Sequence, residues 1–135
     1  MRNIPRTIVW AGVALMLVTG IVHLIDAPDA FDEATYKGLL FAANGIGALI
    51  AAVGIARGAR SWGWGLGLLV AAGAFVGYVA SRTIGLPGIP AEPDAWLEPL
   101  GVVSLVAEGL LVGLAIWANQ ALGRLGESTA AQRTF

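Results

Sequence analysis

The sequence predicts an all-α fold, an integral membrane four-helix bundle with both termini in the cytoplasm (N-in/C-in) and structured outer loops. Three observations predict this class. The 135 residues are 57% hydrophobic and only 13% charged, whereas about 25% of the residues in a soluble domain are charged. Four apolar stretches are each close to the roughly 20 residues that cross a bilayer as a helix. The connections between them alternate between acidic and basic.

The four stretches follow one another with short connections. Backbone groups in lipid must be paired within a segment, so we expect each stretch to be a helix. The first stretch is longer than the apolar core of a signal peptide, about 7–15 residues, so we expect it to stay in the protein. The rest of the layout is one membrane domain over residues 1–125 and a disordered cytoplasmic tail over residues 126–135. The predicted spans are Thr7–Ile25, Lys37–Ala56, Ser61–Arg82 and Pro99–Asn119.

The charges predict the direction of the spans, because cytoplasmic loops carry an excess of Lys and Arg. The N-terminus, the second connection and the tail are basic, through Arg2, Arg6, Arg57, Arg60, Arg124 and Arg133. The first and third connections are acidic, through Asp26, Asp29, Asp32, Glu33, Glu92, Asp94 and Glu98. We therefore expect a multi-pass protein of the cell (inner or plasma) membrane, with the acidic connections outside. Trp62 and Trp64 are expected at the cytoplasmic interface and Trp96 at the outer one.

The partners follow from the same features. The lipid bilayer surrounds the spans, and a net charge of −1 gives no indication of nucleic-acid binding. Four glycine pairs have GxxxG spacing, which lets helices approach closely in lipid. Packing inside the bundle is the favoured interpretation, and contact in a homo-oligomer or a larger membrane complex is the alternative. The pairs are Gly54/Gly58, Gly63/Gly67, Gly73/Gly77 and Gly109/Gly113.

The third connection, residues 83–98, is the longest and is rich in proline and glycine, which favour turns. Its apolar side chains, Leu86, Ile89, Trp96 and Leu97, are expected to hold it against the outer face as a cap. The first connection, with Phe31 among its acids, could complete a lid over the outer half of the bundle.

Six polar side chains lie in the outer halves of the spans at similar depths. Polar groups inside a membrane are costly, so each is a candidate functional residue. Glu108 is the most informative, because it is a carboxyl deep in an apolar helix. We expect it to be paired with Arg82, His23 or Tyr78, and Ser104 lies one turn away on the same face. The candidate ligand-binding residues are His23, Asn44, Tyr78, Arg82, Ser104 and Glu108.

Two interpretations of this group stay open. It could be a site for a ligand, a metal or a proton, or Glu108 paired with Arg82 or His23 could lock the bundle. Asn44 could serve as an interhelical hydrogen bond, and Arg82 could extend to the lipid headgroups.

A metal site is a further hypothesis. His23, the only histidine, could bind a divalent metal together with Asp26 and Glu108. A closed site needs three or four ligands, so a hydrogen-bonding role for His23 is favoured. The chain has no cysteine, and Met16 is its one internal methionine, which argues against copper. The sequence names no cofactor.

Three features carry a resemblance to known proteins: the run Ser81–Gly88 (SRTIGLPG), the pair His23-Leu24, and Glu108 in the fourth span. They resemble small, mostly uncharacterised bacterial four-helix membrane proteins with an SRTxGLPG-like motif. The layout is also similar to that of DoxX-like membrane proteins in hydropathy and glycine content. The resemblance implies that His23, Arg82 and Glu108 form one group, and it implies no particular activity.

The leading functional hypothesis is a small polytopic membrane protein that binds or senses a small ligand, lipid or metal at an outer-leaflet polar site. The alternative is a non-catalytic accessory or assembly subunit of a larger membrane complex, indicated by the small size and the glycine seams. A lipid- or quinone-directed enzyme has less support, because the sequence contains no nucleophile–base pair and no catalytic residue is predicted. An oligomeric transporter also has less support, because the inner half of the chain is apolar.

Overall fold

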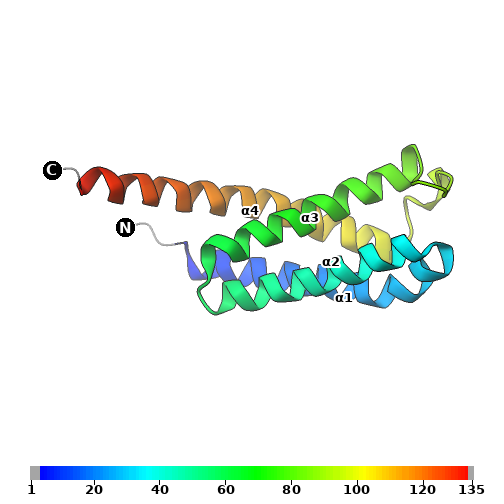
Figure 1. Ribbon diagram of the computed structural model, residues 1–135, viewed down its shortest axis with the longest axis horizontal. Coiled ribbons are helices and arrows are strands. Elements are labelled where there is room, and N and C mark those ends of the chain that lie inside the picture. The colour runs from blue at the N-terminus through cyan, green and yellow to red at the C-terminus, as the bar shows by residue number, and fades with distance from the viewer. Residues whose placement is uncertain (1–3, 134–135) are drawn as a thin grey trace.

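Four long α-helices make up nearly all of the computed structural model, which describes residues 4–133 (Figure 1). A short 3₁₀ helix, η1, lies between the last two. This arrangement confirms the predicted all-α four-helix bundle. The elements are α1 (Arg6–Glu33), α2 (Thr35–Ala56), α3 (Arg60–Thr83), η1 (Pro93–Ala95) and α4 (Pro99–Gln132).

The helices run up and down and form a ring. α1 packs against α2 and α4, and α3 packs against the same two helices. The start of α1, the α2–α3 turn and the end of α4 lie at one end of the molecule, which we call the basic end (Figure 1). The α1–α2 junction and the segment 84–98 lie at the other, which we call the acidic end. The α2–α3 turn closes tightly because Gly58 has a φ of +87°, a backbone conformation that favours glycine.

All four helices are long and apolar enough to cross a membrane. The shortest, α2, has 22 residues and is about 33 Å long, against a hydrocarbon core of about 30 Å. Large apolar side chains cover the outside of the bundle, and Leu40, Leu69 and Leu110 are each more than half exposed. Such a surface, on helices of this length, is typical of a protein embedded in a membrane. The chain is therefore a small polytopic membrane protein with four candidate spans.

The first connection differs from its prediction. α1 continues to Glu33 and includes Pro28, so only Ala34, in an extended conformation, separates α1 from α2. The extra turns are helical because they are packed: Ala27 and Ala30 are buried, and the ring of Phe31 lies over Gly38 of α2. The first connection therefore does not form a loop of a lid.

The fourth helix is also longer than its predicted span. α4 continues to Gln132, through most of the segment predicted to be disordered, and its C-terminal part projects beyond the other three helices (Figure 1). Three of the residues that extend the helix, Ala130, Ala131 and Gln132, are strong helix formers. Residues 134–135 of the predicted tail, and Arg2 at the N-terminus, lie outside the described residues.

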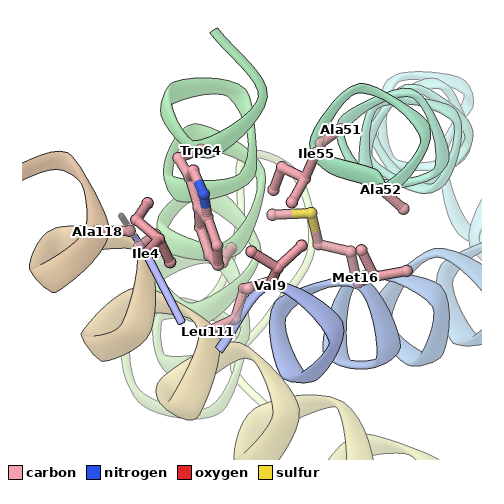
Figure 2. Close-up of a cluster of buried hydrophobic side chains, with 12 residues drawn as sticks. Ile4, Val9, Met16, Ala51, Ala52, Ile55, Trp64, Leu111 and Ala118 are labelled. Carbon is pink, nitrogen blue, oxygen red and sulfur yellow. The ribbon is translucent and has the colours of Figure 1, made fainter. Parts of the chain in front are cut away.

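An apolar core fills the half of the bundle nearest the basic end. Figure 2 shows its side chains converging from the surrounding helices. Trp64 lies at its centre and is completely buried, so its ring packs inside the bundle and not on the surface that the prediction assumed. The indole fits there because Gly12 on α1 has no side chain to collide with it. Trp62 is half exposed and lies against Gly54. The fully buried side chains of the core include Met16, Ala51, Ile55, Trp64, Ala71, Leu111, Ala115 and Ala118.

The glycine pairs divide into two kinds. Gly63 and Gly67 lie inside the bundle, against Ile55 of α2 and Met16 of α1 respectively. In contrast, a side chain added at Gly73, Gly77 or Gly113 would meet no neighbouring atom within 4 Å. Packing inside the bundle thus accounts for Gly63 and Gly67. It does not account for Gly73 and Gly77 on α3 or for Gly113 on α4.

Candidate functional site

A layer of buried polar side chains lies next to the apolar core on its acidic side. It consists of Thr19 and His23 on α1 and of Ser104 and Glu108 on α4, and we call these four residues the polar layer. None of them is more than 7% exposed. In each helix the two residues are four positions apart, so they lie on the same face, one turn apart.

Glu108 lies at the centre of the layer and is only 1% exposed. Its Oε1 accepts a hydrogen bond from the Ser104 hydroxyl over 2.5 Å. The same oxygen lies 3.7 Å from His23 Nε2. The predicted proximity of Glu108 to Ser104 and His23 is therefore present in the structure.

His23 is held by a hydrogen bond at one ring nitrogen and by a packing contact on one face. Its Nδ1 lies 2.9 Å from the backbone oxygen of Thr19, one turn earlier in α1. The ring packs against Phe41 of α2, with the ring centroids 5.1 Å apart. The imidazole is thus directed from α1 toward α4, with its Nε2 facing Glu108.

Several buried oxygens of this region have no hydrogen-bond partner. Among the described residues they are Glu108 Oε2, Thr19 Oγ1 and Asn44 Oδ1. Buried polar atoms without partners are rare in folded proteins and each requires an explanation. Here they come from three helices, α1, α2 and α4.

Asn44 lies at about the same level along the bundle axis as the polar layer. Gly20 of α1 and Gly45 of α2 are in reciprocal backbone contact, since a Cβ on either would lie 3.1 or 3.0 Å from the other's carbonyl oxygen. Thr19 and Asn44 each adjoin one of these glycines. Asn44 Nδ2 donates to the Val70 carbonyl of α3 over 2.9 Å, so part of the side chain serves the expected interhelical hydrogen bond.

Arg82 does not join this group. It is buried, 8% exposed, and its guanidinium is turned toward the segment 84–98. Nη1 lies 3.4 Å from a Glu92 oxygen and Nη2 lies 3.2 Å from a Glu98 oxygen. Nε donates to the Ala95 carbonyl over 3.2 Å. Two expectations are therefore wrong: Arg82 is not the partner of Glu108, and it does not extend to the lipid headgroups.

The segment 84–98 forms a cap on the acidic end, fastened mainly to α3. Tyr78 lies beneath the Arg82 guanidinium, 4.5 Å from ring centroid to Cζ, and its hydroxyl donates to the Trp96 carbonyl. On α2, the Tyr36 hydroxyl donates to the Pro87 carbonyl. Tyr78 and Arg82 thus form a structural clasp for the cap, and Trp96 packs edge-on against Tyr78.

The structure does not assemble the predicted metal site. Within residues 4–133, no three His, Cys, Asp or Glu side chains lie together in an arrangement that could hold a metal ion. Asp26 is half-buried one turn from His23, toward the acidic end. His23, Asp26 and Glu108 therefore do not form a three-ligand set.

Sequence reasoning missed two kinds of participant. Thr19 is one turn from His23 on an apolar helix, a spacing that could have identified it. Glu92 and Glu98 were interpreted only as indicators of topology, whereas they bind Arg82. No periodic signal connects Arg82 with a loop that is ten or more residues away.

Comparison of the chain with protein-family models, with curated proteins and with solved structures finds no match in any of the three. The resemblance to SRTxGLPG and DoxX-like membrane proteins stays a prediction.

Proposed function

We propose that this small polytopic membrane protein is a binding or sensing module and that the polar layer is its binding site. The incomplete hydrogen bonding of Glu108 carries the proposal. Its Oε2 is buried without a partner, and Thr19 in the same layer leaves its hydroxyl oxygen unbonded. An occupant that hydrogen-bonds to these oxygens would complete the layer.

The same observation favours a site over a structural lock. A lock stabilises a fold best when every buried polar atom is bonded, because each unbonded one costs about 1–3 kcal/mol. The Arg82 clasp has that character, since all three of its nitrogens have partners. Glu108 does not, and intramembrane carboxyls are functional candidates by default.

The burial of the layer limits the size of the occupant. Glu108 is 1% exposed and Thr19 is 0% exposed. Two surface cavities lie elsewhere, one beside the cap at the acidic end and one along the C-terminal part of α4. The closed layer restricts the occupant to a proton, a single ion or a water-sized molecule, whereas a lipid headgroup would require the helices to separate.

The test compares Glu108→Gln with Glu127→Gln, an exposed carboxyl on the same helix, in mild detergent. Native mass spectrometry measures bound species, and thermal unfolding is followed as a function of pH. We expect both variants to have a melting temperature close to that of the unmodified protein. We expect only Glu108→Gln to lose the bound mass or the pH response. A large fall in melting temperature in Glu108→Gln, with neither response in the unmodified protein, would make the layer a lock.

The glycines that have no packing neighbour within the bundle favour a second candidate function, an accessory subunit of a larger membrane complex. Gly73 and Gly77 on α3 and Gly113 on α4 have open space beside them, and small residues let a neighbouring helix approach closely in lipid. Stoichiometric binding to another membrane protein, abolished by Gly113→Leu, would support this role.

The orientation is part of the proposal. The charge difference between the two ends supports a cytoplasmic basic end and an external acidic end. In that orientation the polar layer would lie in the outer half of the membrane.

A further inference from the structure

We infer that the occupant of the polar layer is a single proton shared by His23 and Glu108, and that it exchanges only with the acidic side of the membrane. The inference rests on the proposed function, because it names a ligand of the same site. The proton would complete the contact between His23 Nε2 and Glu108 Oε1, and it leaves Glu108 Oε2 and the Thr19 hydroxyl open to a further partner. It makes the protein a one-sided proton sensor.

The orientation of the His23 ring determines where its first proton lies. Nδ1 is 2.9 Å from the Thr19 carbonyl oxygen. A carbonyl oxygen only accepts hydrogen bonds, so Nδ1 must carry the hydrogen. In the neutral ring Nε2 then has the lone pair, and Nε2 is the atom that faces Glu108 Oε1 at 3.7 Å.

A lone pair facing a carboxylate gives repulsion and no hydrogen bond. One proton removes this conflict in either of two positions: on Nε2 it makes an imidazolium beside a carboxylate, and on Glu108 it makes a carboxylic acid beside a neutral ring. Both arrangements have no net charge. Loss of the proton leaves the pair with one negative charge, and a second proton leaves it with one positive charge. Net charge is costly to bury, so the state with one proton is the favoured one.

Charged residues on the surrounding helices do not replace this proton. Lys37 is bonded to Glu33, and Arg82 is bonded to the cap. Besides Glu108, the charged side chain that acts on His23 is Asp26, one turn away on the same helix. The charged residues nearest to the pair along each element are Asp26 on α1, Lys37 on α2, Arg82 on α3 and Glu98 before α4.

An ionisable side chain adjoins the polar layer on one side only. Toward the acidic end, half-buried Asp26 lies one turn beyond His23. Toward the basic end, the layer meets the apolar core, in which Met16, Leu111 and Trp64 are fully buried. This core interrupts any polar route across the bundle. The layer can therefore bind a proton from the acidic side and cannot pass it through.

Loss of the proton has a structural consequence. It leaves an uncompensated carboxylate in an enclosed layer, and that state is relieved by admitting water between α1 and α4. The protonation of one pair is thereby coupled to the packing of two helices.

The experiment uses the full chain in lipid nanodiscs. His23 is the only histidine, so ¹⁵N-histidine NMR reports on this ring alone, and infrared difference spectra report on the Glu108 carboxyl. From about pH 4 to pH 10 we expect Nδ1 to stay protonated and Nε2 to change in a single one-proton step. The Glu108 carboxyl band should change in the same step. Glu108→Gln should abolish this coupled step, whereas Glu127→Gln should leave it unchanged.

Other results would overturn the inference in distinguishable ways. A ring protonated on Nε2 alone, or independent changes at His23 and Glu108, would exclude a shared proton. If native mass spectrometry then found a bound species that Glu108→Gln loses, the proposed function would survive without the shared proton. If no species bound and Glu108→Gln merely lowered the melting temperature, both would fail. Proton flux through the unmodified protein in liposomes, absent in Glu108→Gln, would exclude the one-sided sensor.

Discussion

Two buried ionisable side chains, Arg82 and Glu108, differ in how completely they are bonded. Arg82 uses the planar fork of its guanidinium to hold two carboxylates and a backbone carbonyl of the cap. Glu108 uses one oxygen and leaves the other without a partner. Removal of a partner therefore has different consequences at the two sites: at Arg82 it releases a loop, and at Glu108 it alters a site that is already incomplete.

The first prediction concerns Ser104→Ala. This change removes the one hydroxyl that donates to Glu108 Oε1, leaving the buried carboxyl less satisfied. We expect a loss of about 1–3 kcal/mol in stability, measured by reversible unfolding in detergent. Ser61→Ala, at an exposed position near the start of α3, is the control and should change stability by less than about 0.5 kcal/mol. Equal effects at the two serines would contradict the role of Ser104.

A second prediction concerns Arg82→Lys. A lysine ammonium is a compact charge and cannot reproduce the fork that reaches both Glu92 and Glu98. Because these carboxylates are half exposed or more, we expect a modest loss of about 1 kcal/mol, confined to the cap. Amide hydrogen exchange should become several-fold faster in residues 84–98 and stay unchanged in the helices. Arg57→Lys, in the exposed α2–α3 turn, should leave the exchange of the cap unaltered.

At the scale of elements, glycines bring the backbones of α1 and α2 into close contact. The reciprocal contact of Gly20 and Gly45 leaves no room for a side chain on either helix. Gly113 on α4 has the opposite environment, with open space around it. The same residue type thus serves contact between helix backbones at one position and leaves a helix face open at another.

This contrast gives a third prediction, in which one substitution is made at both positions. Gly45→Leu should force α1 and α2 apart and destabilise the bundle by about 1–3 kcal/mol or more. Gly113→Leu should leave the stability of the isolated chain nearly unchanged. Thermal unfolding of the two variants provides the comparison. Comparable destabilisation by both would mean that the α4 face is packed within the bundle.

The sequence predicts the ends of the helices well where apolar periodicity and length determine them. It predicts them less well where tertiary packing determines them. The starts of α2, α3 and α4 lie within two residues of their predicted positions. The end of α1 does not, because acidic residues and Pro28 are typical of a loop, while Ala27 and Ala30 pack against the bundle. The common depth of His23, Ser104 and Glu108 could be predicted from helical rise. The binding of Arg82 to the cap could not be predicted, because it depends on the conformation of the loop.

At the scale of the whole molecule, the bundle is divided along its axis. The half toward the basic end is an apolar core without an ionisable side chain among its buried residues, and the half toward the acidic end holds the polar layer and the cap. A four-helix bundle built in this way has a closed side and a polar side. Its orientation in the membrane therefore decides which compartment the polar layer faces.

The last prediction concerns that orientation, which cysteine labelling can determine. Because the chain has no cysteine, a single introduced cysteine gives an unambiguous label. Leu97→Cys places a thiol at a position 86% exposed in the cap, and Ser61→Cys places one at the basic end. Cytoplasmic segments of membrane proteins carry an excess of Lys and Arg. We therefore expect an impermeant maleimide to label Leu97→Cys in intact cells and Ser61→Cys only after lysis. The reverse pattern would put the acidic end in the cytoplasm. The polar layer would then face the cytoplasm, and a sensor built on it would respond to internal rather than external protons.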